Sequence, residues 1–357
     1  YHALPDFTSS KGEPTGGLYG LASMLMKIIK DLKPDYLAAC YDLPEPTFRK
    51  AAYDGYKAGR KPIDSALVSQ IERSRDMFTA FNIPIYEAGG FEADDVIGTI
   101  AAKAKDEVRV VIASGDLDTL QLVDDKRVLV YTLKKGIQDT ILYDEAAVMA
   151  RFEFLPKYIP DWKGLRGDPS DNIIGITGIG EKTATIIVKA FGSLEEFYQA
   201  LVSDLKKVAA LELSDRIIGL LREGEEEALF SKSLATIRLD APVDFKLPDN
   251  LWLTGLDKKL VENLFIELGF RSLVARLNDL GKTEEKKEEA KSEGKKKKKT
   301  EAVDETLLTE TGIMLWLLNS DLTSPTHEDI LQQTGVASLV EAKEKLEKDL
   351  VAAGLKE

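Results

Sequence analysis

Acidic residues gather in four short stretches of this chain, each placed where a strand or a turn is predicted to end. Asp42 closes the run DYLAACYD, the pair in SGDLD follows the run VRVVIA, and the other two stretches are FEADD and GDPSDN. The candidate metal ligands that they supply are Asp42, Glu92, Asp94, Asp95, Asp116, Asp118, Asp168 and Asp171. Carboxylates without histidine or cysteine partners favour hard cations, so the set predicts Mg²⁺, for which Mn²⁺ can substitute.

Eight carboxylates on one edge of a sheet would repel one another unless cations lay between them. Two ions about 4 Å apart would balance this charge and suit the in-line hydrolysis of a phosphodiester. The formal net charge is −13, and removing the eight carboxylates leaves −13 + 8 = −5. The acidic total therefore does not argue against a nucleic-acid partner once ions are bound. Only two histidines are present, far apart in sequence, which disfavours a zinc site.

Each acidic stretch also has a structural interpretation when it is considered alone. FEADD suits the start of a helix, where acidic side chains interact favourably with the helix dipole. SGDLD suits a capped turn, and GDPSDN suits a loop of turn-forming residues. The places of the stretches after predicted strands favour the metal site, because functional residues of parallel sheets lie at the carboxyl ends of strands.

Two further stretches suit contacts with a nucleic acid. TFRKAAYDGYKAGRKP combines cations with tyrosines, which suits a phosphate backbone with unpaired bases. Its candidate DNA-binding residues are Arg49, Tyr53, Tyr56, Lys57, Arg60 and Lys61. GITGIGEKTA is a glycine-rich turn that opens a helix, a helix–hairpin–helix signature that can hold a phosphate. Its candidates are Gly178, Gly180, Lys182 and Thr183. The alternatives are a solvated basic loop and an ordinary helical turn.

The elements that must position these residues alternate between strands and helices. The runs DYLAACYD, IPIYEA and VRVVIA predict strands, and helical periodicity covers 16–32, 64–82 and 92–105. This order predicts an α/β fold with a parallel sheet flanked by helices. Beyond about residue 156 the strand signals fade and helices with Gly and Pro turns dominate, which predicts a helical subdomain.

We predict five segments: a nuclease-type core over 1–155, a helical subdomain over 156–240, the C-terminal part of the nuclease-type domain over 241–281, a charged linker over 282–304 and a further region over 305–357. The linker has almost no apolar residues, and its lysines at 295–299 suit a solvated tether better than a DNA contact. No apolar run reaches the ~18 residues of a membrane span. The single cysteine, Cys40, suits a core position in a protein of the reducing cytoplasm.

The motifs together resemble the 5′-nuclease domain of bacterial DNA polymerase I, a relative of the flap endonucleases, over residues 1 to about 280. The matching stretches are GEPTGGLYG, TFRKAAYDGYKAGR, FEADDVIGTIA, SGDLDTLQL, GLRGDPSDNIIGITGIGEKTA and SKSLATI. The resemblance implies a PIN-like core with a helix–hairpin–helix (H3TH-type) subdomain. It also implies a bacterial, nucleoid-associated 5′-3′ exonuclease and flap endonuclease that acts on nicked, 5′-flapped or branched DNA in primer removal and repair.

The resemblance also assigns roles to single residues. The family's first metal position falls to Asp42, Glu92, Asp94 and Asp116, and the second to Asp118, Asp168 and Asp171, with Asp95 close by. Lys57 and Arg60 match the basic pair that contacts the scissile phosphate and are the candidate catalytic cations. The hairpin residues match the turn that grips the downstream duplex, where the family also binds K⁺.

One departure from the family leaves a second interpretation open. The family begins with a strand whose Asp ligates the first metal, upstream of the segment aligned with Tyr1, and we expect this chain to be a fragment without it. It would then be a DNA-binding chain without turnover. A third interpretation, a Mg²⁺-dependent RNA nuclease, is disfavoured by the hairpin at 174–183. Residues 305–357 match the start of the vestigial proofreading-like region that precedes a covalently linked polymerase domain, and they show no acidic proofreading motif.

Overall fold

The computed structural model describes residues 7–135, 139–280, 305–318, 327–336 and 338–352. The chain divides into two compact units, Tyr1–Gly281 and Lys282–Glu357, and each is described by itself. The predicted linker at 282–304 lies outside the described residues. No helix in the described ranges has the length and apolar character that a membrane span requires.

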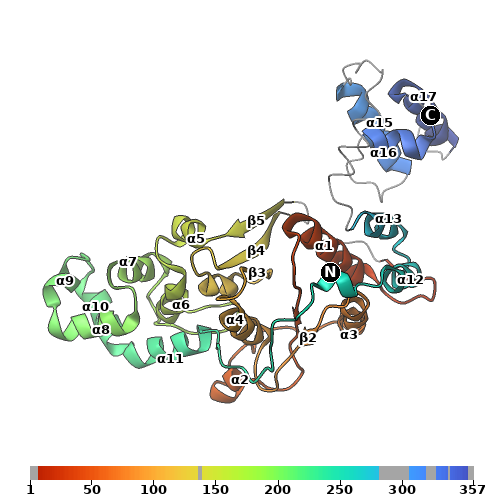
Figure 1. Cartoon of the computed structure of the whole chain (residues 1–357). Coiled ribbons are helices and arrows are strands. Elements are labelled where there is room, and N and C mark those ends of the chain that lie inside the picture. The colour runs from red at the N-terminus through yellow and green to blue at the C-terminus, as the bar shows by residue number, and fades with distance from the viewer. Residues whose placement is uncertain (1–6, 136–138, 281–304, 319–326, 337, 353–357) are drawn as a thin grey trace. The chain divides into compact units, whose positions relative to one another are not determined.

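The strands of the first unit form two small sheets (Figure 1). β1 (Ala39–Cys40) pairs in parallel with β2 (Ile85–Tyr86). β3 (Val110–Ala113) pairs in parallel with β4 (Val128–Lys135), which pairs antiparallel with β5 (Asp139–Tyr143). The three strands predicted from DYLAACYD, IPIYEA and VRVVIA are present, although the first two cover only two residues each. The predicted parallel pairing is confirmed in β1–β2 and β3–β4, and the antiparallel pair β4–β5 is an addition that the sequence did not predict.

One end of this unit is a helical layer in which α1 (Gly16–Leu32), α3 (Ser65–Ala80), α12 (Lys258–Leu268) and α13 (Arg271–Asp279) share a core (Figure 1). Met77, Phe81 and Phe265 are fully buried in it. The helices expected at 16–32 and 64–82 are confirmed as α1 and α3. The helix expected at 92–105 is α4 (Ala93–Ala104), which lies between this layer and the helical subdomain.

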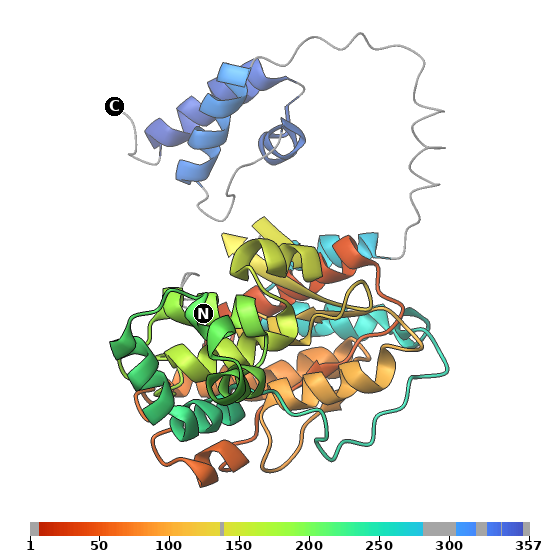
Figure 2. The same ribbon diagram turned by 90° about the vertical axis from the view of Figure 1, so that its left-hand side faces the viewer.

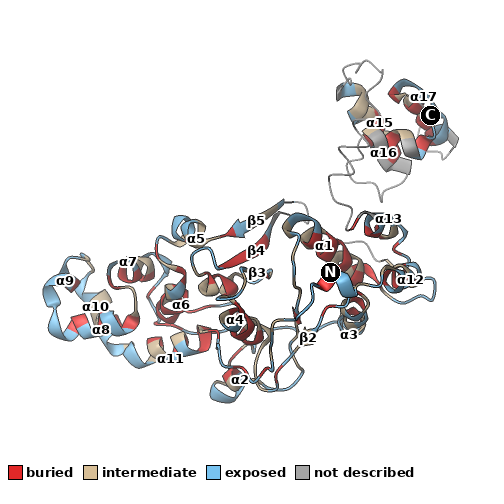
Figure 3. Cartoon of the chain, in the orientation of Figure 1, coloured by how far each residue is buried: buried red, intermediate tan, exposed pale blue. Residues whose placement is uncertain are grey.

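The helical subdomain occupies the opposite end of the unit and is drawn in green in Figure 2. It follows α5 (Glu145–Phe152) and consists of α6 (Ile159–Arg166), α7 (Glu181–Phe191), α8 (Leu194–Ser203), α9 (Leu205–Ala209), α10 (Asp215–Glu223) and α11 (Glu225–Ala235). Leu165, Ile187 and Phe197 are buried in its core. Helix α6 packs directly on α11, since a Cβ on Gly164 would lie 2.7 Å from the carbonyl oxygen of Ala228. Figure 3 shows the resulting run of buried residues along α6.

The second unit contains α15 (Glu305–Leu318), α16 (His327–Thr334) and α17 (Leu339–Ala352). Its own core includes Leu315, Ile330 and Leu346. The helix predicted at 340–352 is confirmed as α17, and the periodic run IMLWLLNSDL begins within α15 and continues beyond the described residues.

Candidate active site

Two of the acidic stretches lie where parallel strands end. Asp42 follows β1, and its Oδ1 accepts a hydrogen bond from the backbone N–H of Ala93, 2.8 Å away, at the start of α4. Asp116 follows β3 and caps the 3₁₀ helix Leu117–Leu122 by accepting from the N–H of Asp118 at 2.9 Å. The first contact ties the end of β1 to the stretch that carries Glu92 and Asp94.

Electrostatic coupling links these carboxylates into one group. Burial and the charges of Asp116, Asp42, Asp118 and Glu92 raise the pKa of Asp94 from its ordinary 3.8 to about 7. Burial also raises the pKa of Asp118, and the charges of Asp116 and Asp168 add to this rise, while Lys163 opposes it. We call the resulting group the acidic cluster: Asp42, Glu92, Asp94, Asp116, Asp118 and Asp168.

Asp171 joins the acidic cluster through a shared phenol. The hydroxyl of Tyr56 lies 3.0 Å from Glu92 Oε2 and 3.2 Å from Asp171 Oδ2, and the tyrosine is buried. Burial and the two carboxylates raise the pKa of Tyr56, which therefore stays a neutral donor. The prediction that Tyr56 faces DNA finds no support here, because its side chain lies inside the protein between two carboxylates.

Four cations of the protein lie against the acidic side chains, and one of them is the buried Arg49, whose Nη1 donates to Glu92 Oε2 at 3.3 Å. Lys57 Nζ donates to Glu92 Oε1 at 2.8 Å, and Arg60 Nη2 donates to Asp171 Oδ1 at 2.6 Å. The buried Lys163 bridges Asp118 and Asp168, with a distance of 2.5 Å to Asp168 Oδ2. Within the described ranges no three carboxylates converge closely enough to hold an ion as they stand.

The donor set nevertheless fits a hard divalent cation. All of its ligand atoms are oxygens, and burial together with the repulsion of the neighbouring carboxylates raises the pKa of Asp94 to about 7. A bound cation would relieve this repulsion, which a zinc-type set of histidine and cysteine ligands would not require.

Asp95 differs from its neighbours in the candidate metal set. It is fully buried, and its two oxygens accept from both Nη atoms of Arg49 at 2.7 and 2.8 Å and from the N–H groups of Glu92 and Arg238 at 3.0 and 2.8 Å. These four bonds use its acceptor capacity. The structure therefore supports a structural role for Asp95 and gives no support to its prediction as a metal ligand.

Arg49 is the other half of this structural pair. Besides Asp95 and Glu92, its guanidinium donates to the carbonyl oxygens of Leu234 and Thr236, each 2.8 Å away. These contacts join α2 (Phe48–Ala52) to α4 and to the end of α11. Because Arg49 is buried with its donors engaged, its predicted contact with DNA is not possible in this conformation.

The other predicted DNA-binding residues lie nearer the surface. The side chains of Lys57 and Arg60 are 26% and 54% exposed, and Lys61 is exposed. Tyr53 is half-buried and packs edge-on against Phe230, with ring centroids 6.0 Å apart. Lys57 has a left-handed backbone, with φ of 54°, and its N–H donates to the carbonyl of Asp171 at 2.9 Å. The basic loop is thus bound directly to the GDPSDN stretch.

The hairpin, residues 174–183, connects α6 to α7. Gly178 has φ of +92°, and Gly180 is the N-cap residue of α7. No side chain caps this helix start, so its first backbone N–H groups are available to an anion. Lys182 is exposed and Thr183 half-buried in the first turn of α7. The geometry is compatible with the predicted phosphate contact.

Lys163 is the residue that sequence reasoning missed. It stands five positions before Asp168 in DWKGLRGD and looks like an ordinary helical lysine. The available signal was its position among Trp162, Gly164 and Leu165, which are all buried with it on α6. A charged residue in such a run is expected to have a paired partner.

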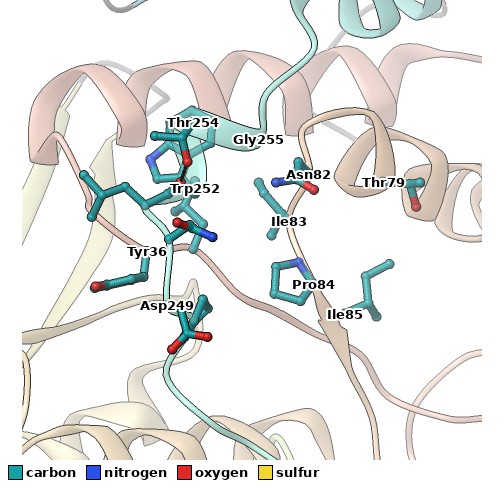
Figure 4. A pocket seen from close by; sticks show the side chains of 14 residues that line it. Tyr36, Thr79, Asn82, Ile83, Pro84, Ile85, Asp249, Trp252, Thr254 and Gly255 are labelled. Carbon is teal, nitrogen blue, oxygen red and sulfur yellow. Dashed lines mark hydrogen bonds between the residues drawn. The ribbon is translucent and has the colours of Figure 1, made fainter.

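A groove of about 880 Å³ lies away from these residues. It is lined by the segments that precede β1 and β2 and by residues 248–255, and Figure 4 shows Trp252 and Asp249 facing Asn82 and Pro84 across it. This position is at the amino ends of the two strands, whereas Asp42 follows a carboxyl end. The groove contains none of the candidate site residues.

Comparison with known proteins identifies the fold that carries this site. Residues 1–153 match the family model of the 5′-3′ exonuclease N-terminal resolvase-like domain, and residues 154–259 match that of the 5′-3′ exonuclease C-terminal SAM fold. The chain belongs to the 5′-3′ exonuclease family. The expected fold, a PIN-like α/β core followed by a helical subdomain, is confirmed, and the matched domains are those of a nuclease that hydrolyses phosphodiester bonds.

Curated relatives of this 5′-3′ exonuclease are DNA polymerases I. That of Bacillus caldotenax is 39% identical over 287 residues, which are 80% of this chain and 32% of the relative. That of Bacillus subtilis is 38% identical over 280 residues, 78% of this chain and 31% of the relative. The chain thus spans about a third of the length of the curated relatives that it matches.

Solved structures agree on the fold of the exonuclease. The T5 5′-exonuclease with bound zinc superposes with a TM-score of 0.51 at 22% identity, covering 63% of this chain and 82% of that one. The T5 D15 protein co-crystallised with metal ions gives a TM-score of 0.50 at 22% identity, covering 60% and 80%. At this level of identity the likeness shows the fold alone.

Proposed function

We propose that the chain is a structure-specific 5′-3′ exonuclease and flap endonuclease that hydrolyses DNA with two divalent ions, Mg²⁺ or Mn²⁺. The observation that carries the proposal is the acidic cluster, in which the ends of β1 and β3 and the start of α4 bring carboxylates together, and burial with their charges raises the pKa of Asp94 to about 7. Carboxylate charge that the neighbouring lysines do not fully balance favours cation binding.

The acidic residues would be shared between two positions. Asp42, Glu92, Asp94 and Asp116 would hold one ion, and Asp118, Asp168 and Asp171 the other. The bound ions would supply an activated water and stabilisation of the charge that develops on the phosphate. The carboxylates would hold and orient the two ions, and no side chain would have to transfer a proton.

Lys57 and Arg60 would act on the scissile phosphate. Both are partly exposed, and in the absence of ions and DNA both lie against carboxylates, Glu92 and Asp171. Once ions neutralise those carboxylates, the two cations are free to face a phosphate and stabilise its charge in the transition state. Their position beside the acidic cluster supports a catalytic role over a purely electrostatic one.

The substrate would be nicked, 5′-flapped or branched DNA, met in primer removal and repair. The open helix start at Gly180, with the exposed Lys182, supports a contact with the phosphates of a downstream duplex, and K⁺ would suit the same turn. The curated relatives are named DNA polymerase I, so we also propose a covalently linked polymerase domain in the full-length protein and a place in the bacterial cytoplasm.

A DNA-binding chain without turnover is the second candidate function. The two sheets, β1–β2 and β3–β4–β5, are not joined by hydrogen bonds between described strands. A further parallel strand between β1 and β3 would join them and could carry another ligand, as the resemblance implies. Without it the first ion would have an incomplete ligand set.

Cleavage of a 5′-labelled flapped duplex tests both functions. We expect 5′-phosphorylated products with Mg²⁺ or Mn²⁺, no products with EDTA, and a loss of orders of magnitude in rate for Asp116→Asn with unchanged far-ultraviolet circular dichroism. Full activity in EDTA would contradict the two-ion proposal. If only a chain extended at its N-terminus by the family's first strand cleaves, while the present chain binds the duplex, the second candidate is correct.

A further inference from the structure

Lys163 occupies the place between two carboxylates of the proposed second metal position. Its ammonium bridges Asp118 Oδ1 and Asp168 Oδ2, the latter at 2.5 Å. The ammonium group of Lys163 therefore occupies the position between the two carboxylates that a divalent ion would need.

The hydrogen bonds of Asp168 leave little room for both the Lys163 ammonium and a metal ion. Its Oδ1 accepts from the backbone N–H of Ser170 at 2.9 Å and from the Ser170 hydroxyl at 2.6 Å, while its Oδ2 accepts from Lys163. An oxygen offers about two acceptor positions, so Oδ1 is fully used. An ion that binds Asp168 must therefore use Oδ2, where Lys163 Nζ already lies.

Lys163 differs from Lys57 and Arg60 in its access to solvent. Its side chain is 8% exposed, against 26% for Lys57 and 54% for Arg60. Its backbone is also fixed, because α6 packs on α11 at Gly164, the next residue. Lys57 and Arg60 can turn outward to a phosphate, whereas Lys163 can only exchange one partner for another inside the protein.

We propose that Lys163 and the second divalent ion compete for Asp118 and Asp168. In the absence of the ion the ammonium holds the two carboxylates together, and binding of the ion displaces it. Lys163 is then an internal counter-ion that keeps the metal-free site assembled and lowers the affinity of that position for metal. This inference rests on the proposed two-ion function and adds a residue that sets its metal dependence.

Mn²⁺ binding to the full chain, followed by the electron paramagnetic resonance signal of the free ion, tests the competition. Lys163→Met removes the charge and keeps an apolar stem of similar length, and Lys163→Arg keeps the charge. Lys206→Met, on the exposed surface of α9, is the matched control for the loss of one positive charge. We expect one bound ion to gain about tenfold or more in affinity in Lys163→Met. We expect no gain in Lys163→Arg or in Lys206→Met.

The outcomes separate this inference from the proposed function. No Mn²⁺ binding by the unaltered chain would contradict the proposed function itself. Equal or weaker binding by Lys163→Met, with normal binding by the unaltered chain, would overturn the competition alone and would mean that Lys163 orients the carboxylates for the ion. If metal-free Lys163→Met is unfolded, recovery of its circular dichroism with Mn²⁺ supports replacement of the ammonium by the ion. Failure to recover at saturating Mn²⁺ contradicts it.

Discussion

At the scale of single residues, Asp94 and Asp95 show how neighbouring carboxylates acquire different roles. Both stand in the first turn of α4, but successive helical residues point about 100° apart. Asp94 turns toward the acidic cluster, while Asp95 turns toward Arg49 and the N–H of Arg238. The sequence identifies the acidic stretch, but the rotation of the helix, and so the role of each carboxylate, depends on the tertiary contacts of α4.

The raised pKa of Asp94 predicts how stability changes with pH. The metal-free folded protein keeps a proton on Asp94 up to about pH 7, whereas the unfolded chain releases it near 3.8. The folded state therefore binds more protons in this window, and the free energy of unfolding falls as pH rises through it, by up to about 4 kcal/mol. Urea unfolding in EDTA at about pH 5 and pH 8 measures the part of this fall that lies above pH 5, about 3 kcal/mol.

The control for that measurement is Asp94→Asn, which has no titrating group at this position and should lose part of the pH dependence. Mn²⁺ affinity of the unaltered chain should rise over the same range, since the ion competes with the proton. If the stability of Asp94→Asn depended on pH as steeply as that of the unaltered chain, Asp94 would not be the group that causes this dependence.

The pair Arg49–Asp95 predicts a second difference between carboxylates. Asp95→Asn would leave the buried Arg49 without its charged partner, so we expect the free energy of unfolding in EDTA to fall by about 3–5 kcal/mol. Asp116→Asn removes an exposed member of the acidic cluster and should leave stability within about 1 kcal/mol. Denaturant titration of both variants makes the comparison. Similar stability losses for both would show that Asp95 has no special structural role.

At the scale of elements, the sequence predicted the helices whose apolar residues recur at a helical period. The apolar residues of α1 recur at helical spacing and Pro34 follows its end, so the bounds 16–32 agree with Gly16–Leu32. The pair β4–β5 was missed because VLVYTLKK has no alternation, as is usual for a strand buried on both faces. The ion pairs of Lys163 and the burial of Arg49 and Tyr56 depend on contacts between segments that are distant in sequence. Local periodicity carries no information about such contacts.

The hairpin offers a variant that separates DNA contact from folding. A Cβ on Gly180 would meet no atom within 4 Å, and its φ of −100° suits any residue. We therefore expect Gly180→Val with Lys182→Ala to fold and bind Mn²⁺ normally and to bind nicked or flapped duplexes more weakly, equally for unrelated sequences, because backbone contacts carry no base information. Titrations with labelled duplexes measure this loss, and unchanged duplex affinity would show that the DNA is held elsewhere.

Gly175 is the matched control in the same hairpin. It has φ of +62°, and a Cβ there would lie 2.1 Å from the backbone nitrogen of Gly167. Gly175→Ala should therefore lower stability through strain and a backbone clash, and any loss of DNA binding should follow the loss of fold. If Gly175→Ala were as stable as Gly180→Val, the tight approach of these two segments would not be required.

At the scale of the whole molecule, each unit has a hydrophobic core of its own, which predicts that the nuclease does not need the second unit. Leu165, Phe197 and Phe265 belong to cores of the first unit, and Ile330 to that of the second. A chain of residues 1–281 should keep the melting temperature of the nuclease transition and the rate of flap cleavage, as measured by calorimetry and by the cleavage assay. A large fall in either quantity would contradict this independence.

The net charge of −13 bears on DNA binding at this scale. Bound ions would reverse the local field at the acidic cluster, Arg60 lies against Asp171, and Lys61 and Lys182 are exposed. Association with DNA should therefore depend on divalent ions as well as on ionic strength.

Anomalous scattering from Mn²⁺ in crystals of the chain would locate the two proposed metal positions. We expect two peaks about 4 Å apart, one beside Asp42, Glu92, Asp94 and Asp116 and the other beside Asp118, Asp168 and Asp171. The second peak should appear only where Lys163 Nζ has moved from between its two carboxylates. Mn²⁺ bound elsewhere, with the acidic cluster empty in a crystal whose protein cleaves DNA, would contradict the two-ion proposal.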